Sequence, residues 1–384
     1  MEKKKLPTCP VGTICGGCQY QGTSYEKQLE LKQKYEEKLL SSFGKVNQIK
    51  GMEYHYFYRN KVQVTFGRDY KGRIVYGNFV TSTHKIVQIK ECQIASRISN
   101  AIFRTIRELV LSFKLSIFDE DRMEGFLRHV LVRTTRNEEE VMVVLVTGEQ
   151  VFPNRRDFIN ALLRKHPQIV TVIQNVNRRR TSMILGERET VLYGKGYIID
   201  ELCGKQFRIS SKSFYQVNYA QTEYLYNTAI SLADIRKEDT VLDAYCGIGT
   251  IGMVMADHAG KVIGVELNKA AVNDARNNAK MNNVNNIEFV CADAGKYMQK
   301  AVRDKENIDV VIMDPPRAGA DDKFLSSLVK LSPERIVYIS CNPVTLKRDL
   351  TYLKKKSYEV KNIQPVDMFP FTDHVECIAL LCRK

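Results

Sequence analysis

The chain has 384 residues, of which 44% are hydrophobic, and 58 Lys and Arg against 44 Asp and Glu give it a formal net charge of +14. This length predicts about two domains with real hydrophobic cores. The sequence has no apolar run of about 18 residues, which excludes a transmembrane helix, and its first residues contain no secretory signal, so a cytoplasmic protein is expected. The positive charge favours a polyanionic partner such as nucleic acid, although ordinary solubility charge would also explain it.

Residues 1–20 are rich in cysteine and glycine and form a candidate metal-binding segment. Three cysteines follow the pattern C-x5-C-x2-C, and a fourth thiolate can come from "KECQIAS". The four residues are Cys9, Cys15, Cys18 and Cys92. In a reducing compartment such cysteines bind metal or act in catalysis more often than they form disulfides. Four thiolates suit zinc or an iron–sulfur cluster, but zinc sites usually comprise two C-x2-C pairs, whereas this pattern is three plus one.

The next two segments differ in texture. Residues 21–52 contain one amphipathic helix, capped by Ser24 and stopped by Gly44, which is expected to link to the catalytic domain or pack on it. Residues 53–210 consist of short β-type runs broken by Gly and Asn. These runs predict a mainly antiparallel α+β domain with one helix near residues 99–114.

Cations and aromatic rings gather in this central domain. Arg178, Arg179 and Arg180 form a basic triplet, and a run of aromatic residues precedes Arg59. Further cations in nearby motifs are Lys61, Arg128 and Arg133. Such a mixture can stack unpaired bases and hold phosphates, so the domain is predicted to bind RNA, although a charge run is by default a solvated face.

Strands and helices alternate in residues 211–384. Five apolar runs lie 20–30 residues apart with helical segments between them, which predicts a Rossmann-like α/β domain built on a parallel sheet with helices on both faces. Two final runs, "YEVKNIQPVDMF" and "HVECIALLCRK", are expected to close the sheet as a hairpin.

A glycine-rich loop follows the first strand of this domain. Gly247, Gly249 and Gly252 fit the dinucleotide pattern G-x-G-x-x-G, and Glu266 ends the second strand, where a carboxylate can bind both ribose hydroxyls. A nicotinamide cofactor is therefore one option. Asp243 favours S-adenosylmethionine instead, because its carboxylate lies where the cationic methionine amine would be. "DPPR", at the end of the fourth strand, supports the same choice, since an Asp-Pro-Pro turn there holds a planar heterocycle in many nucleic-acid methyltransferases.

Cys341 follows the next strand, in "ISCNP", at the edge where open α/β sheets bind ligands. Carbon 5 of uracil is a weak nucleophile, and a thiolate that adds to carbon 6 turns it into an enolate able to attack a sulfonium methyl group. A base must then remove the carbon-5 proton, and Glu376 is the candidate because it is the carboxylate that begins the last strand. The alternatives are a core cysteine, as expected for Cys246, Cys291, Cys377 and Cys382, and an amino-methyltransferase in which the thiol is idle.

Five motifs give the chain a resemblance to the RNA uracil-5-methyltransferase family. In order they are "SFYQVN", "LDAYCGIGT", "DPPR", "SCNP" and "HVE", and "LRHVLVR" and "IQNVNRRRTSMILG" extend the likeness to the central domain. The resemblance implies a class I methyltransferase domain in which Cys341 is the nucleophile and Glu376 the proton acceptor. It also implies contacts to S-adenosylmethionine from Gln216, Tyr245, Thr250, Glu266 and Asp314.

The resemblance to cluster-bearing members of this family implies a [4Fe–4S] cluster on the four cysteines. A methyl transfer through a thiolate needs no electrons, so the cluster is expected to be structural or part of the RNA-binding surface. Some ribosomal-RNA members carry an extra N-terminal barrel, for which there is no room before Cys9. The short, cluster-bearing form resembles a ribosomal-RNA subgroup, which predicts 23S ribosomal RNA as the substrate and transfer RNA as the alternative. A monomer is expected, and a non-catalytic iron–sulfur RNA-binding protein is the remaining rival.

Overall fold

The computed structural model describes residues 8–80 and 83–384, and the chain divides into two compact units. The first unit comprises Met1–Gly22, Tyr54–Asp200 and Ile209–Lys212. The second unit comprises Thr23–Glu53, Glu201–Arg208 and Ser213–Lys384. No helix in these described ranges is long and apolar enough to cross a membrane.

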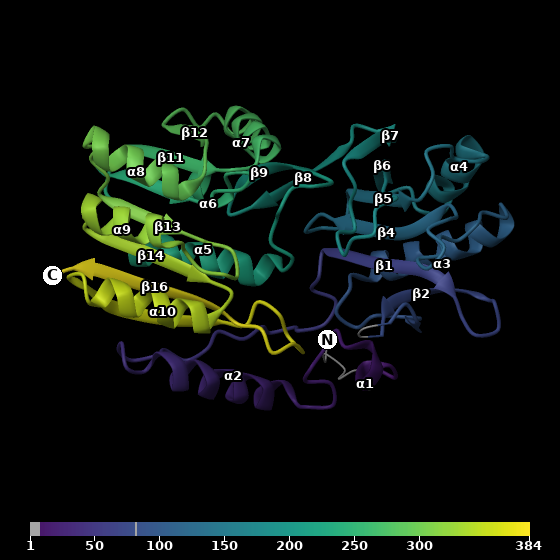
Figure 1. The fold of residues 1–384 in the computed structure, drawn as a ribbon, viewed down its shortest axis with the longest axis horizontal. Coiled ribbons are helices and arrows are strands. Elements are labelled where there is room, and N and C mark those ends of the chain that lie inside the picture. Colours follow the sequence, from purple (N-terminus) through teal and green to yellow (C-terminus); the bar gives the residue numbers. More distant parts are fainter. Residues whose placement is uncertain (1–7, 81–82) are drawn as a thin grey trace. The chain divides into compact units, whose positions relative to one another are not determined.

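The first unit is built on a seven-stranded sheet in the order β3-β2-β1-β4-β5-β6-β7 (Figure 1). Its strands are β1 (Lys61–Arg68), β2 (Ile74–Phe79), β3 (Ile86–Gln88), β4 (Leu127–Thr134), β5 (Val141–Thr147), β6 (Ile169–Val176) and β7 (Arg188–Gly194). Neighbouring strands are antiparallel except β5 and β6, which are parallel. The central strands β4 and β5 are buried at every position, which explains their nearly continuous apolar sequence.

Two long helices share the core of this sheet. Helix α3 (Arg97–Ser112) occupies the place of the helix predicted near residues 99–114, and α4 (Arg155–Lys165) forms the crossover between the parallel strands. Helix α4 was not predicted, because only Phe158, Ile159 and Leu162 of its polar sequence are buried. The unit also contains the short α1 (Gly12–Cys15), while β8 (Tyr197–Leu202) and β9 (Lys205–Ser210) form a separate two-stranded sheet.

The second unit is built on a seven-stranded sheet in the order β12-β11-β10-β13-β14-β16-β15. Its strands are β10 (Thr240–Ala244), β11 (Lys261–Glu266), β12 (Ile287–Cys291), β13 (Val310–Met313), β14 (Arg335–Ser340), β15 (Tyr358–Val366) and β16 (Glu376–Arg383). The first five strands in this order are parallel, and β16 and β15 are antiparallel, so the doubly wound sheet ends in a reversed hairpin.

Helices alternate with the parallel strands of this unit. They are α5 (Tyr219–Ala233), α6 (Thr250–Met255), α7 (Lys269–Met281), α8 (Ala294–Asp304), α9 (Asp322–Leu331) and α10 (Pro343–Lys354). Side chains of α8, α9 and α10 form one core with every second residue of β10 and β13, including Leu242, Ala244, Val311 and Met313. This alternation leaves the polar loops at the strand ends free to form a site.

Helix α2 (Tyr25–Leu40) belongs to the second unit and lies beside α10 and β15 (Figure 1). Ser24 caps it, since Lys27 N donates to Ser24 Oγ at 3.3 Å. Along one face Gln28, Lys32 and Glu36 recur every four residues, and all three are fully or almost fully buried. Buried polar groups need partners, and this stripe faces the chain segment that leads into β16, as the contacts below show.

Candidate active site

Five predicted site residues meet at one edge of the second unit's sheet. Asp243 is the next-to-last residue of β10, Glu266 ends β11, Asp314 follows β13 and Cys341 follows β14. Strand β16 is antiparallel to β14, so its first residue, Glu376, begins at that same edge. The topology therefore gathers four carboxyl groups and one thiol where an open α/β sheet binds ligands.

The catalytic base candidate is a buried carboxyl group. Ser340 pairs with Cys377, which sets Cys341 beside Glu376 across the two strands. Glu376 is 3% exposed, and its Oε2 has no hydrogen-bond partner among the described residues. Burial, and then the negative charge of Asp314, hold the pKa of Glu376 well above its usual range. A carboxyl group held in this way is a strong base once it is ionised.

The thiol lies in the same negative surroundings. Burial and, after it, the carboxyl groups of Glu376 and Asp314 raise the pKa of Cys341 to about 11, against the opposing effect of Arg317. At neutral pH the free protein therefore holds a thiol at this position, and the nucleophilic thiolate forms only when the site gains positive charge or a base accepts the proton.

Asn342 fixes the loop that carries this thiol. Its Oδ1 accepts from Val344 N at 3.1 Å and caps α10, while its Nδ2 donates to the Arg317 carbonyl at 2.9 Å. Ser340 Oγ donates to the Asn342 carbonyl at 3.1 Å, and Pro343 supplies the first helical residue, where no N–H is needed. "SCNP" is thus tied to the "DPPR" turn, which explains the carboxamide and the proline after the cysteine.

Glu266 organises the glycine-rich loop. Its Oε2 accepts from Gly247 N at 3.1 Å and its Oε1 accepts from Asn268 N at 2.7 Å. Tyr245, which enters this loop, has a φ of 67°, a left-handed conformation that side chains rarely adopt and that is often found at functional sites. Both carboxylate oxygens keep further lone pairs, so Glu266 can still accept from a ribose hydroxyl.

Asp243 is a second buried carboxyl group without a full set of partners. It is 1% exposed, and its Oδ2 has no hydrogen-bond partner among the described residues. A Cβ added at Gly252 would lie 2.7 Å from this oxygen, so a glycine is required there. Burial raises the pKa of Asp243 well above its usual value. An orphaned carboxyl group of this kind fits the ammonium group of a cationic ligand.

The other predicted cofactor contacts have partners inside the protein. Thr250 is the first residue of α6, and its Oγ1 lies 2.9 Å from the Tyr226 hydroxyl. The Tyr245 ring lies 5.5 Å from the Phe324 ring, and Gln216 is buried in the loop before α5. The structure places these three residues near the glycine-rich loop or the helix that follows β9, and their contacts to a cofactor stay predictions.

Helix α2 holds the loop that leads into β16. Asp367 Oδ2 accepts from the Tyr25 hydroxyl at 2.7 Å, and its Oδ1 accepts from Lys32 Nζ at 2.5 Å. Gln28 Oε1 accepts from Phe371 N at 2.9 Å, where the backbone has a φ of 69°. These buried contacts fix the approach to the base candidate, and no sequence pattern predicts them, because the partners lie 335 to 343 residues apart.

Two further features of this edge were also missed. Arg317 Nη2 lies 3.4 Å from His374 Nε2, so the "DPPR" turn contacts the residue two before Glu376. A cavity of about 550 Å³ lies beside the ends of β11 and β12. It is lined by Leu267, Asp293, Lys296, Asp321, Asp322 and Lys323. Asp293 is the second residue after β12, so it belongs to the polar residues at the strand ends of this edge.

The four predicted metal ligands come together in the first unit. Cys9, Cys15, Cys18 and Cys92 line one cavity of about 30 Å³, and all four are free thiols. Burial, opposed by a hydrogen bond from Gln21 and assisted by the other three thiols, raises the pKa of Cys18 to about 11. Within residues 8–80 and 83–384, however, no three His, Cys, Asp or Glu side chains are arranged to hold a metal ion. The residue types fit a thiolate site, and the predicted cluster is not confirmed.

Comparisons with known proteins agree on one family. The model of the tRNA (Uracil-5-)-methyltransferase family matches residues 24–384. Uncharacterized RNA methyltransferases of Halalkalibacterium halodurans and Clostridium tetani are 40% and 41% identical to this chain over 381 and 379 residues, covering 98% of it and 83% and 82% of their own lengths.

A solved structure extends this agreement to the fold. The Pyrococcus abyssi tRNA (uracil-54, C5)-methyltransferase, in complex with S-adenosyl-L-homocysteine, matches with a TM-score of 0.81 and 30% identity over 99% of this chain and 87% of that one. The class I methyltransferase fold predicted from the sequence is thereby confirmed. The chain belongs to the tRNA (uracil-5-)-methyltransferase family and is an S-adenosylmethionine-dependent RNA methyltransferase.

Proposed function

We propose that the protein methylates carbon 5 of a uridine in RNA, with Cys341 as nucleophile and Glu376 as base. The observation that carries this proposal is the position of Cys341 beside Glu376 at one sheet edge, with Asp314 close enough to affect both. An amino-methyltransferase would have no use for this pair. A nicotinamide enzyme is disfavoured by the family to which the chain belongs.

In the proposed reaction Cys341 loses its proton and its sulfur adds to carbon 6 of the uracil, which makes carbon 5 nucleophilic. S-adenosylmethionine, when bound, supplies the methyl group that carbon 5 takes. Glu376 then removes the proton from carbon 5, the double bond between carbons 5 and 6 re-forms, and the Cys341 thiolate leaves. One methyl group enters the base and one proton leaves it.

The carboxyl groups of the site would favour binding of the cationic methyl donor. The unpartnered Oδ2 of Asp243 is suited to the methionine ammonium group, and Glu266 to the ribose hydroxyls. Contacts to the donor from Asp314 and from three further residues, Gln216, Tyr245 and Thr250, are part of this proposal. A positive charge bound here would lower the raised pKa values of Glu376 and Cys341, so donor binding would also favour the ionised base and the thiolate.

An RNA that carries 5-fluorouridine tests the mechanism. Carbon 5 of this base receives the methyl group and keeps fluorine, so Glu376 finds no proton to remove and Cys341 stays bonded to carbon 6. We expect a band of reduced mobility in denaturing electrophoresis that Cys341→Ala abolishes together with turnover. Cys291→Ala should keep both, because Cys291 is exposed and the expectation that it lies in the core was wrong. Methylation by Cys341→Ala would refute the mechanism and favour an amino-methyltransferase.

We propose 23S ribosomal RNA as the substrate, because the chain resembles the four-cysteine members of the family. Transfer RNA is the second candidate, and the similarity to the Pyrococcus abyssi tRNA enzyme favours it. Mass spectrometry of ribosomal and transfer RNA from cells with and without the gene separates the two. Loss of 5-methyluridine from one RNA class only identifies the substrate and its position.

We also propose that Cys9, Cys15, Cys18 and Cys92 hold a [4Fe–4S] cluster, supported by the four free thiols around one cavity. Protein purified without oxygen should be brown and contain about four irons per chain. Replacing Cys92 by Ala should remove as much iron as replacing Cys15, because either change removes one ligand. Colourless protein with one zinc ion would contradict the proposal.

A further inference from the structure

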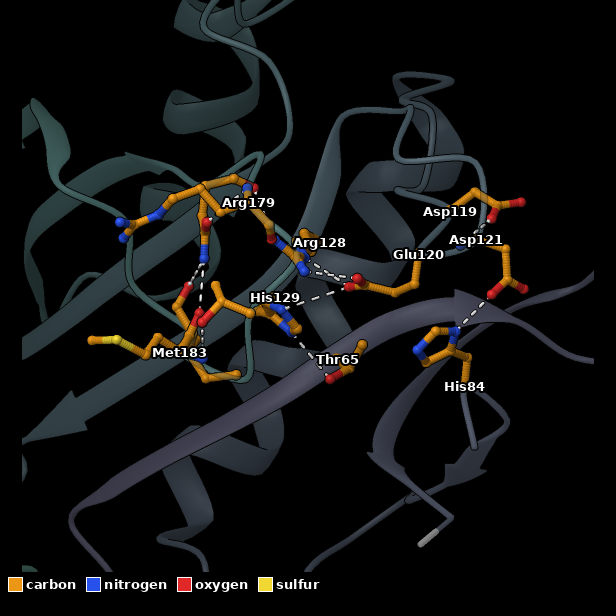
Figure 2. A network of polar contacts seen from close by, with 12 residues as sticks. Thr65, His84, Asp119, Glu120, Asp121, Arg128, His129, Arg179 and Met183 are labelled. Atoms are coloured by element: carbon orange, nitrogen blue, oxygen red, sulfur yellow. Dashed lines mark hydrogen bonds and ion pairs between the residues drawn. The ribbon is translucent and has the colours of Figure 1, made fainter. Parts of the chain in front are cut away.

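A larger cavity, of about 630 Å³, lies in the first unit, on none of the elements that carry Cys341 and Glu376 (Figure 2). Its lining includes Thr65, Phe79, Glu120, Arg128, His129 and Ile184. A cavity of this size is in the range of small-molecule sites. Most of its lining residues are polar or charged, and Phe79 and Ile184 supply its apolar side chains.

A β-bulge aims two consecutive side chains at this cavity. Leu127 pairs with Thr147 and His129 with Val146, so Arg128 is the extra residue of β4. Successive side chains of a regular strand point to opposite faces, whereas at this bulge both Arg128 and His129 line the same cavity. Bulges recur beside functional sites because they redirect side chains in this way.

All three guanidinium nitrogens of the buried Arg128 donate hydrogen bonds within the protein. It forms two bonds of 2.7 Å to the two carboxylate oxygens of Glu120, and its Nη1 donates to the carbonyls of Asn177 and Arg179 at 3.0 and 3.1 Å (Figure 2). Its guanidinium group also lies over the Phe118 ring at 4.8 Å. This arginine therefore supports the loop that carries the basic triplet and has little capacity left for a phosphate.

The supported loop, residues 177–184, has a fixed shape. Asn177 Nδ2 donates to the carbonyls of Met183 and Ile184 at 2.8 and 3.0 Å, and Asn177 Oδ1 accepts from Arg179 N at 3.2 Å. The triplet Arg178–Arg180 is exposed on this loop. Of the triplet, Arg180 lines the cavity, and cations on an ordered loop bind an anion with a smaller entropy cost than cations on a mobile one.

His129 gives the cavity a neutral polar group. It is 4% exposed, its Nδ1 lies 3.0 Å from Thr65 Oγ1, and its Nε2 lies 3.9 Å from Glu120 Oε1, beyond hydrogen-bonding distance. Burial, and then the charge of Arg128, lower the pKa of His129 to about 3. The ring is therefore uncharged at neutral pH, and it can form a hydrogen bond with a ligand without favouring a charged one.

The distribution of charge distinguishes a base from a phosphate. Inside the cavity the charge of Glu120 is balanced by Arg128, and Asp121 lies 2.7 Å from His84, so an anion would meet carboxylates there. An uncharged heterocycle would meet instead the Phe79 ring, aliphatic carbon and the neutral histidine. The net positive charge lies on the exposed triplet, where the flanking phosphates of a bound base would be.

We infer that this cavity receives an unpaired base of the substrate RNA, while Arg178–Arg180 contact the adjoining phosphates. The inference rests on the proposed RNA substrate and assigns it a second contact site, separate from the uridine that is methylated. An RNA base held in a pocket of the first unit would select substrates by the position of an unstacked nucleotide.

The absence of tryptophan from the chain allows a direct test. Phe79→Trp places the only indole of the protein in the cavity wall, where a stacked base quenches its fluorescence. A short single-stranded oligoribonucleotide should quench it in a saturable way, and an oligonucleotide of equal length with abasic residues should not. Tyr193→Trp, on the exposed edge strand β7, is the control and should respond equally weakly to both. Equal quenching of Phe79→Trp by the two oligonucleotides, or none by either, would overturn the inference.

A second variant separates this inference from the proposed chemistry. His129→Leu removes the polar group and keeps an apolar side chain, so it should weaken oligonucleotide binding to the Phe79→Trp reporter about fivefold or more. In methylation assays it should raise KM for RNA and leave kcat unchanged, because it does not touch the reacting atoms. Quenching with no methylation of uridine would refute the proposed function alone, and methylation with no quenching would refute the cavity alone.

Discussion

Two glutamates, half-buried Glu120 in the first unit and buried Glu376 in the second, differ in their partners. In the first unit, Glu120 has both carboxylate oxygens bonded to the guanidinium of Arg128. In the second unit, Glu376 has an oxygen with no hydrogen-bond partner in the described part of the chain, and burial raises its pKa. A matched pair satisfies its charge and acts as a support, whereas an unmatched carboxyl group is costly to ionise and is therefore reactive. The same residue type thus forms a structural ion pair in the first unit and is the proposed base in the second.

Helix α2 repeats this contrast within four residues. Lys32 is buried against Asp367, which satisfies both charges. Glu36, one turn further on, is also buried, and although it contacts Cys377, neither of its oxygens has a standard hydrogen bond among the described residues. Burial raises the pKa of Glu36 to about 8, so this side chain is neutral at physiological pH. Glu36 is therefore a second buried acid without an ion-pair partner, and it contacts Cys377, the residue after Glu376 in β16.

Replacing Glu376, the proposed base, should have the largest effect on activity. Glu376→Gln keeps the shape of the side chain and loses the proton acceptor, so formation of 5-methyluridine should slow by about 10²- to 10⁴-fold. Addition of Cys341 stays possible, so the covalent adduct should accumulate on ordinary RNA and be visible in denaturing electrophoresis. Glu359→Gln, on an exposed part of β15, is the control. Normal turnover by Glu376→Gln would assign the base to another group.

Breaking the matched pair should instead lower stability. Glu120→Leu leaves the buried Arg128 charge without a negatively charged partner, so the free energy of unfolding should fall by about 3–5 kcal/mol. Thermal unfolding followed by circular dichroism measures this change. The double variant Glu120→Leu/Arg128→Met should recover part of the loss, because no charge then remains unpaired. A single variant with unchanged stability would show that the pair does not support the fold.

Glu36 should make stability depend on pH. The unfolded chain loses this proton near pH 4.5 and the folded protein only near pH 8, so the free energy of unfolding should fall as pH rises between these values, by up to about 1.4 kcal/mol per unit. Below pH 4.5 both states hold the proton and the effect is absent. Glu36→Gln should remove this dependence and be more stable than the parent at pH 9. Glu26→Gln, on the exposed side of α2, should change neither.

The smallest expected effect distinguishes the two kinds of arginine. Arg179 is exposed, unlike Arg128, and its Nη1 lies 3.0 Å from Glu187 at the surface. Arg179→Ala should weaken RNA binding and reduce the slope of log affinity against log salt concentration by about 1, since one phosphate contact is lost. Arg155→Ala, on the exposed start of α4, is the matched control. An unchanged slope would place the phosphates elsewhere.

The sequence predicted what is local and repetitive. The rhythm of strands and helices predicted the parallel sheet, and polar residues at strand ends predicted the edge where Asp243, Asp314 and Cys341 lie. What it missed depends on distant partners. The buried stripe of α2 reads as a solvated face until Asp367 is placed opposite Lys32. The sequence pattern does not predict the bulge at Arg128, because a bulge is defined by how β4 pairs with β5.

Polar composition hid other features. Helix α4 was overlooked because its sequence is mostly charged, and the parallel pairing of β5 with β6 follows from that helix. Arg317 was quoted within "DPPR" without a role, although it contacts His374 and lowers the pKa of the nearby thiol. Such side chains act through distances and fields that only a fold defines.

The bonds from α2 to the loop before β16 have a consequence for biosynthesis. Tyr25 and Lys32 leave the ribosome early, and their partner Asp367 is made more than 330 residues later. Until then Tyr25 and Lys32 lack their buried partner, and contacts of such long sequence separation form slowly. The loop that leads into β16 and Glu376 therefore cannot take its final position until nearly the whole chain has been made.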